Sequence, residues 1–105
     1  MSKVFVEYAI KSEFRYAFLI YMHELLQREG RLELLEGTDQ EGLFVEIWND
    51  VTYEEYLRMK KERLDEVARE ALKEDLKEDL QADWEKWIQG GIRKLHMWHF
   101  KPVSS

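Results

Sequence analysis

The chain has 105 residues, of which 45% are hydrophobic and 13% aromatic, and its net charge is -6 at pH 7. This length predicts one domain, residues 1–105, and the composition excludes a disordered protein. The absence of cysteine excludes disulfides, thiolate metal sites and a cysteine nucleophile, while the negative charge disfavours nucleic acid as a partner.

The sequence contains no signal for secretion or membrane insertion. Residues 1–10 lack a basic, apolar secretory pattern, and the longest apolar run, YAFLIYM at 16–22, is far shorter than the roughly 20 residues that span a bilayer. We therefore expect a soluble, cytoplasmic protein without a membrane partner.

The first half of the chain predicts a strand, a helix and a hairpin. In KVFVEYAI at 3–10 the character of the side chains alternates from one residue to the next, and the segment is rich in β-branched and aromatic residues. Both features are typical of a strand. A helix of four to five turns follows, with Ser12 as a candidate N-cap and Gly30 as a candidate C-terminal cap. RLELLEG and GLFVEIW are then two strand-like runs around the turn-forming residues EGTDQEG, which predicts a hairpin.

The second half begins with a helix whose end is harder to place. Thr52 and Glu55 have the spacing of a capping box. A helix from there to Ile88 would be about 55 Å long, far longer than the strands, so we expect a break near 80–83. Asp83 would cap a separate short helix containing Trp84 and Trp87, which either anchor that helix or cover a cavity.

KLHMWHF at 94–100 supplies the last strand and completes the order βαββαβ. This order predicts an α+β, ferredoxin-like fold with a four-stranded antiparallel sheet and two helices on one face. The first and third strands are then central neighbours, and the last strand pairs with the first. Residues 62–89 form an acidic helical insertion before that last strand.

Alternation along the strands divides their side chains between two faces. One set is mainly aliphatic and is expected to form the core under the helices: Val4, Val6, Tyr8, Ile10, Leu32, Leu34, Leu43, Val45, Ile47, Leu95, Met97 and His99. The other set combines aromatic rings with ionisable groups: Phe5, Glu7, Ala9, Arg31, Glu33, Leu35, Phe44, Glu46, Trp48, His96, Trp98 and Phe100. An uncovered face of this kind is larger than the apolar patches of most soluble monomers, so we expect a second copy to cover it.

The topology and this aromatic face resemble the dimeric α/β-barrel superfamily. That superfamily includes antibiotic-biosynthesis-type monooxygenases, haem-degrading monooxygenases, stress-responsive barrel proteins and NIPSNAP-like proteins. The resemblance covers residues 3–61 and 94–102, and VEIWNDVTYEEYLRMKKER is similar in style to their strand-to-helix segment. It implies a homodimer whose cavity, within the barrel or between sheet and helices, binds a small hydrophobic molecule.

Haem degradation does not fit the residues present. The haem-degrading branch uses an asparagine on the first strand and a tryptophan and a histidine on the second helix. This chain has no asparagine in its first strand, Tyr56 at the tryptophan position, and no histidine between Thr52 and Ile88. We therefore expect no cofactor.

Three ionisable residues on the predicted aromatic face are candidates for chemistry. If Glu7, Glu46 and His96 converge, a carboxylate with a raised pKa could transfer protons, or the three could bind a divalent metal. The alternative is that they satisfy one another or Arg31 by hydrogen bonds across a dimer interface. We name Glu7, Glu46 and His96 as candidate acid–base residues and assign no metal site.

The sequence thus predicts a homodimeric barrel protein that binds a small apolar or aromatic molecule, with cofactor-free monooxygenase-like activity as one option. The predicted ligand-binding residues are the five large rings of the second face: Phe5, Phe44, Trp48, Trp98 and Phe100. A second hypothesis is a non-catalytic interaction protein whose acidic insertion docks a partner.

Overall fold

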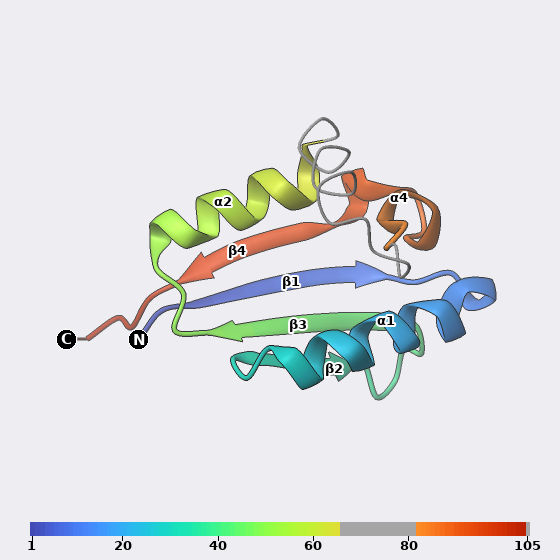
Figure 1. The fold of residues 1–105 in the computed structure, drawn as a ribbon, viewed down its shortest axis with the longest axis horizontal. Coiled ribbons are helices and arrows are strands. Elements are labelled where there is room, and N and C mark those ends of the chain that lie inside the picture. The colour runs from blue at the N-terminus through green and yellow to red at the C-terminus, as the bar shows by residue number, and fades with distance from the viewer. Residues whose placement is uncertain (66–81, 105) are drawn as a thin grey trace.

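A computed structural model describes residues 1–65 and 82–104 of the chain. Its main elements follow the predicted order (Figure 1): β1 (Lys3–Ala9), α1 (Arg15–Arg28), β2 (Leu32–Glu36), β3 (Leu43–Asn49), α2 (Tyr53–Leu64), α4 (Trp84–Trp87) and β4 (His96–Phe100). Two short 3-10 turns, Ser12–Phe14 and Ile92–Lys94, precede α1 and β4. No helix in the described ranges is long and apolar enough to cross a bilayer.

The four strands form one antiparallel sheet in the order β2-β3-β1-β4. The central strands are therefore β1 and β3, and β4 pairs with β1, as the βαββαβ order predicted. Both long helices contact the same face of this sheet, since Phe18 of α1 packs on Phe44 and Arg63 of α2 binds Glu46. The ferredoxin-like prediction is confirmed.

The register corrects the predicted faces of one strand. Val6 of β1 is directly opposite Glu46 of β3, and Glu7 is opposite Val45. Because residues opposite each other point to the same side, the even-numbered residues of β3 lie under the helices. Phe44, Glu46 and Trp48 are accordingly buried. The prediction that these three share a face with Phe5 is wrong, whereas the faces predicted for β1 and β4 are correct.

The helix-covered face forms the core. Its strand residues are joined there by side chains from α1, α2 and α4, and the buried hydrophobic residues are Val4, Val6, Tyr8, Ile10, Phe18, Met22, Leu32, Phe44, Trp48, Val51, Tyr56, Trp84, Trp87, Ile88, Leu95 and Met97. Phe5, Val45 and Trp98 lie on the opposite face, which no other described element covers.

The predicted caps are partly confirmed. Thr52 accepts a hydrogen bond from the Glu55 backbone N–H, and the Glu55 carboxylate accepts one from the Thr52 N–H, which is the expected capping box. At α1 the Ser12 prediction is wrong, because Ser12 begins a 3-10 turn instead of capping the helix. Gly30 directly follows the C-cap residue Glu29, as expected, but it does not have the positive φ of a glycine cap.

The second helix ends earlier than predicted. In the described residues α2 stops at Leu64 and Asp65 has extended backbone angles, so the helix that begins after Thr52 ends well before 80–83. Asp83 does cap the short helix α4, because its carboxylate accepts from the Lys86 N–H. Much of the predicted acidic insertion, residues 66–81, lies outside the described residues, and its docking role stays a prediction.

Candidate functional site in the cleft between α1 and α2

A buried polar network lies under the helices at the centre of the sheet. Glu46 of β3 is fully buried, and both its oxygens bind the guanidinium of Arg63 at 3.1 and 2.9 Å. The Trp48 indole N–H donates to the same carboxylate at 2.9 Å, and the Tyr8 hydroxyl donates to it as well. The carboxylate therefore accepts four hydrogen bonds, which fills its roughly four lone-pair sites.

This environment determines the ionisation of the network. Burial alone would raise the pKa of Glu46, but the charge and hydrogen bonds of Arg63, with the donors Tyr8 and Trp48, hold that pKa below its ordinary value. Burial and the adjacent Glu46 carboxylate raise the pKa of Tyr8 well above its ordinary value. Glu46 is thus an ionised, saturated acceptor and a poor general base, because a base needs a vacant lone pair and a matched pKa.

Arg63 joins three elements at this point. It lies in the last turn of α2, and its guanidinium binds Glu46 on β3. The guanidinium also stacks over the ring of Trp84 in α4, with 4.6 Å between Cζ and the ring centroid. Such a cation–π contact is stronger when it is shielded from water, and the Arg63 side chain is only 16% exposed. The end of α2 is therefore fixed against both the sheet and α4.

Trp84 and Trp87 are anchors for α4. Both are buried, and the Trp84 ring contacts Tyr8 of β1 at 5.2 Å and Tyr21 of α1 at 5.8 Å between centroids. Trp87 packs edge-on against Phe18. The structure supports anchoring for both tryptophans, and Trp84 also lines a cavity.

Next to the network, residues of α1, α2, α4 and β3 line a partly open cavity of about 170 Å³. We call it the inner cavity, and its lining is mainly apolar and aromatic: Tyr21, Leu25, Trp48, Met59, Glu62, Arg63 and Trp84. An engineered cavity of similar size, about 150 Å³, holds one benzene molecule. The inner cavity therefore has room for a single aromatic ring.

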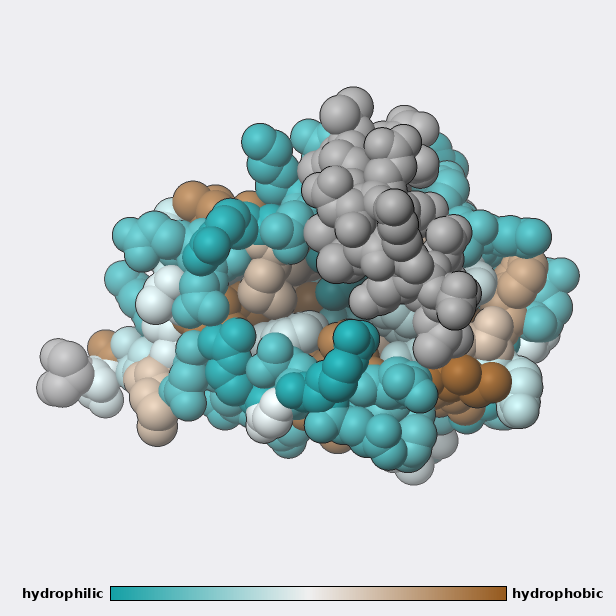
Figure 2. Space-filling model, viewed as in Figure 1, coloured by the Kyte–Doolittle hydropathy of each residue, from teal (hydrophilic) through white to brown (hydrophobic). Residues whose placement is uncertain are grey.

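A second, more polar cavity of about 340 Å³ lies next to the first. We call it the outer cavity; it is lined by Glu29, Arg31, Trp48, Glu55, Arg58, Met59 and Glu62. The two cavities share Trp48, Met59 and Glu62. They form one cleft, and Figure 2 shows the more apolar residues between the hydrophilic surfaces of α1 and α2.

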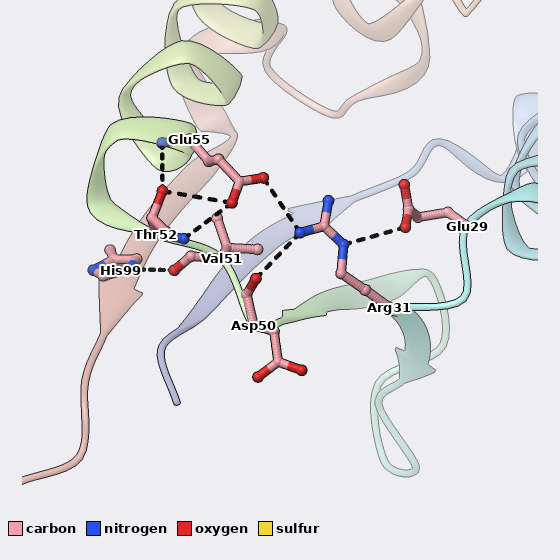
Figure 3. Close-up of polar contacts among 7 residues, drawn as sticks. All are labelled: Glu29, Arg31, Asp50, Val51, Thr52, Glu55 and His99. Carbon is pink, nitrogen blue, oxygen red and sulfur yellow. Dashed lines mark hydrogen bonds and ion pairs between the residues drawn. The ribbon is translucent and has the colours of Figure 1, made fainter.

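Arg31 organises the charged wall of the outer cavity (Figure 3). Its guanidinium binds the carboxylates of Glu29 at 3.3 Å and Glu55 at 3.2 Å, and it donates to the Asp50 carbonyl oxygen at 3.1 Å. The hydrogen bonds from Thr52 and from Arg31 lower the pKa of Glu55. Arg31 therefore ties the start of α2 to the segment that enters β2.

Comparison with solved structures identifies the architecture. The chain superimposes on the protein Atu4242 from Agrobacterium tumefaciens with a TM-score of 0.57 and 12% identity, over 99% of this chain and 95% of that one. It superimposes on a protein from Nitrosomonas europaea, described as a putative antibiotic biosynthesis monooxygenase, with a TM-score of 0.55 and 16% identity, over 98% and 99% of the two chains. This chain therefore has a ferredoxin-like fold, which it shares with these two solved structures. No protein-family model and no curated protein matches the sequence.

The ferredoxin-like sheet separates the predicted acid–base residues. Glu7 and His96 are directly opposite each other on β1 and β4, on the open face. Glu46 lies on the helix-covered face, so the predicted convergence of the three residues is wrong. Among the described residues, no group of three potential metal-ligating side chains lies close enough to hold an ion.

The predicted ligand-binding rings are likewise divided between the open face and the helix-covered face of the sheet. Phe5, Trp98 and Phe100 lie on the open face and line a groove of about 460 Å³ with Glu7 and Val45. The rings of Phe5 and Phe100 meet edge to face at 5.1 Å. Phe44 and Trp48 lie under the helices instead, and Trp48 lines both parts of the cleft.

Sequence reasoning missed Arg63, although one signal was present. Arg63 is seven residues after the buried Tyr56, and this spacing places both on one face of α2. A carboxylate in a central strand needs a buried cation, and Arg63 was the basic residue at the matching helical position. The helix residues Tyr21 and Met59 carried no comparable signal.

Proposed function

We propose that this protein binds a small apolar or aromatic molecule in the cleft between α1 and α2. The observation that carries the proposal is the inner cavity, whose walls include the rings of Tyr21, Trp48 and Trp84 together with Arg63, which is paired with the buried Glu46. Aromatic walls favour an aromatic guest through offset and edge-on contacts. A ring that enters this cavity would be removed from water without displacing any hydrogen bond of Glu46.

The open face of the sheet supports the second part of the proposal, which is a homodimer. Trp98 and Phe100 are 43% and 52% exposed, Leu35 is 52% exposed, and the groove beside them is mainly apolar. Apolar exposure of this extent on one sheet face is typical of a surface that another protein covers. A second copy would bury these residues and would leave the α1–α2 cleft of each copy accessible.

Monooxygenase-like activity is a second candidate function, and the fold shared with the Nitrosomonas protein favours it. In a cofactor-free reaction the bound ligand supplies the electrons, one atom of O₂ enters the ligand and the other leaves as water. Mass spectrometry of products formed under ¹⁸O₂ would detect the labelled atom. A ligand recovered unchanged would leave binding as the function.

Binding itself is tested by native mass spectrometry and by titration. The purified protein should appear as a dimer, and any mass released on denaturation would identify the natural guest. Single-ring compounds should bind with one site per chain, and Leu25→Trp should abolish this binding because the larger ring fills the inner cavity. Leu35→Trp, a matched change on the open face, should leave binding intact. Equal binding by wild type and Leu25→Trp would contradict the proposed site.

A further inference from the structure

We infer that the guest of the cleft is a single-ring aromatic compound that carries a positively charged amine on a short side chain. This inference rests on the proposed function and specifies the ligand class for the same cleft. Its basis is the distribution of charge along the cleft, from the inner cavity to the outer cavity.

The inner cavity is suited to the uncharged ring. Arg63, the cation that lines it, is neutralised by the buried Glu46 through two hydrogen bonds. A charged ligand group at this depth would have no opposite charge left to pair with, and burying an unpaired charge is costly. The ligand's charge must therefore lie farther out.

Among the described residues, Glu62 is the carboxylate that lines the inner cavity. It lines both cavities and so stands where they join, next to Trp48 and Met59. Among the described residues, Glu62 makes no hydrogen bond or ion pair. An ammonium group one or two carbons from a ring in the inner cavity would therefore come close to an uncompensated carboxylate.

The other charged residues of the outer cavity also favour a positively charged ligand group over a negatively charged one. In the outer cavity Arg31 is occupied by Glu29 and Glu55, so these three groups together are negative. Arg58 is the remaining cation of the lining, and it lines only the outer cavity and not the inner one. It precedes Glu62 by four residues, about 6 Å along the axis of α2, which places it farther from the ring than Glu62. An acidic ligand group would meet Glu62 before it could reach Arg58.

Three matched compounds test the inference: 2-phenylethylamine, 2-phenylethanol and 3-phenylpropanoate. They share the ring and a two-carbon linker and differ in charge. By isothermal titration calorimetry at low salt, the amine should bind about fivefold more tightly than the alcohol, as expected for one partly exposed ion pair, and the acid more weakly than the alcohol. The preference should decrease with added salt because the cleft is open to solvent.

Variants assign the preference to Glu62. The ratio of amine to alcohol affinity should fall to about one in Glu62→Gln and rise in Arg58→Gln, which removes the opposing charge. Glu54→Gln makes the same charge change on α2 outside the cleft and should keep the wild-type ratio. An amine that binds no better than the alcohol, or a preference that survives in Glu62→Gln, overturns the inference while the cleft remains a binding site. If none of the three compounds binds, the proposed function itself fails.

Discussion

Arg63 and Glu46 form a bidentate ion pair that links the last turn of α2 to the centre of β3. The two N···O distances are 3.1 and 2.9 Å, and the Glu46 side chain is completely buried. Arg63 also lines the inner cavity, and its pairing with Glu46 favours burial of this face of β3 under the helices. The stability of the fold therefore depends on it.

Breaking this pair from one side should destabilise the fold strongly. Glu46→Gln leaves the Arg63 guanidinium buried without its countercharge, and we expect a loss of about 3–5 kcal/mol in the free energy of unfolding. Urea denaturation of the variant and wild type would measure it. Glu54→Gln, a change at an exposed carboxylate of α2, should stay within about 0.5 kcal/mol of wild type.

Removing both charges should lower the free energy of unfolding by less than the sum of the two single changes. In Glu46→Leu/Arg63→Met neither charge is left unpaired, and apolar replacements of buried pairs are often neutral or stabilising. A double-mutant cycle should therefore give a large coupling energy between the two positions. Additive single and double effects would show that the two residues act independently.

The ion pair between Arg15 and Glu36 should make stability depend on pH. Hydrogen bonds from Arg15 and from the Gly42 N–H lower the pKa of Glu36 from 4.5 to about 2. Because this folded-state pKa is depressed, the stabilisation is complete above about pH 4.5 and is lost as pH falls toward 2. The stability difference between wild type and Arg15→Gln should therefore shrink between pH 5 and pH 2.5 in urea titrations. The same difference at both pH values would show that the pair does not stabilise the fold.

The open face should control assembly. Trp98→Asp places a charge on the proposed dimer surface, and we expect the dimer dissociation constant to rise more than tenfold. Light scattering coupled to gel filtration over a concentration series would measure this change. Tyr53→Asp alters a residue that is 59% exposed on α2, so it should leave the assembly as in wild type. A Trp98→Asp protein that stays dimeric would place the interface elsewhere.

The capping box at the start of α2 should contribute a separate increment of stability. Thr52→Ala removes the acceptor for the Glu55 N–H, and we expect a loss of about 0.5–2 kcal/mol. Thr52→Ser keeps the hydroxyl and should retain most of the stability in the same thermal or urea measurements. If serine and alanine are equally destabilising, the effect does not come from the cap.

Local sequence signals determined the order of elements and much of the sheet. The turn residues between β2 and β3, the capping box at Thr52 and Asp83 before α4 all act within a few residues, and the structure confirms each of them. The alternation of β1 and β4 also predicted their faces, because in each strand the residues on the two sides differ clearly in character.

Only the tertiary structure decided the face of β3 and the position of the site. In LFVEIWN both alternating sets are largely apolar, so hydrophobicity could not choose between them. The choice depended on Arg63, which reaches Glu46 from a helix 17 residues away and makes burial of a carboxylate tolerable. The end of α2 and the cleft follow from the same long-range contacts, which no local pattern in the sequence encodes.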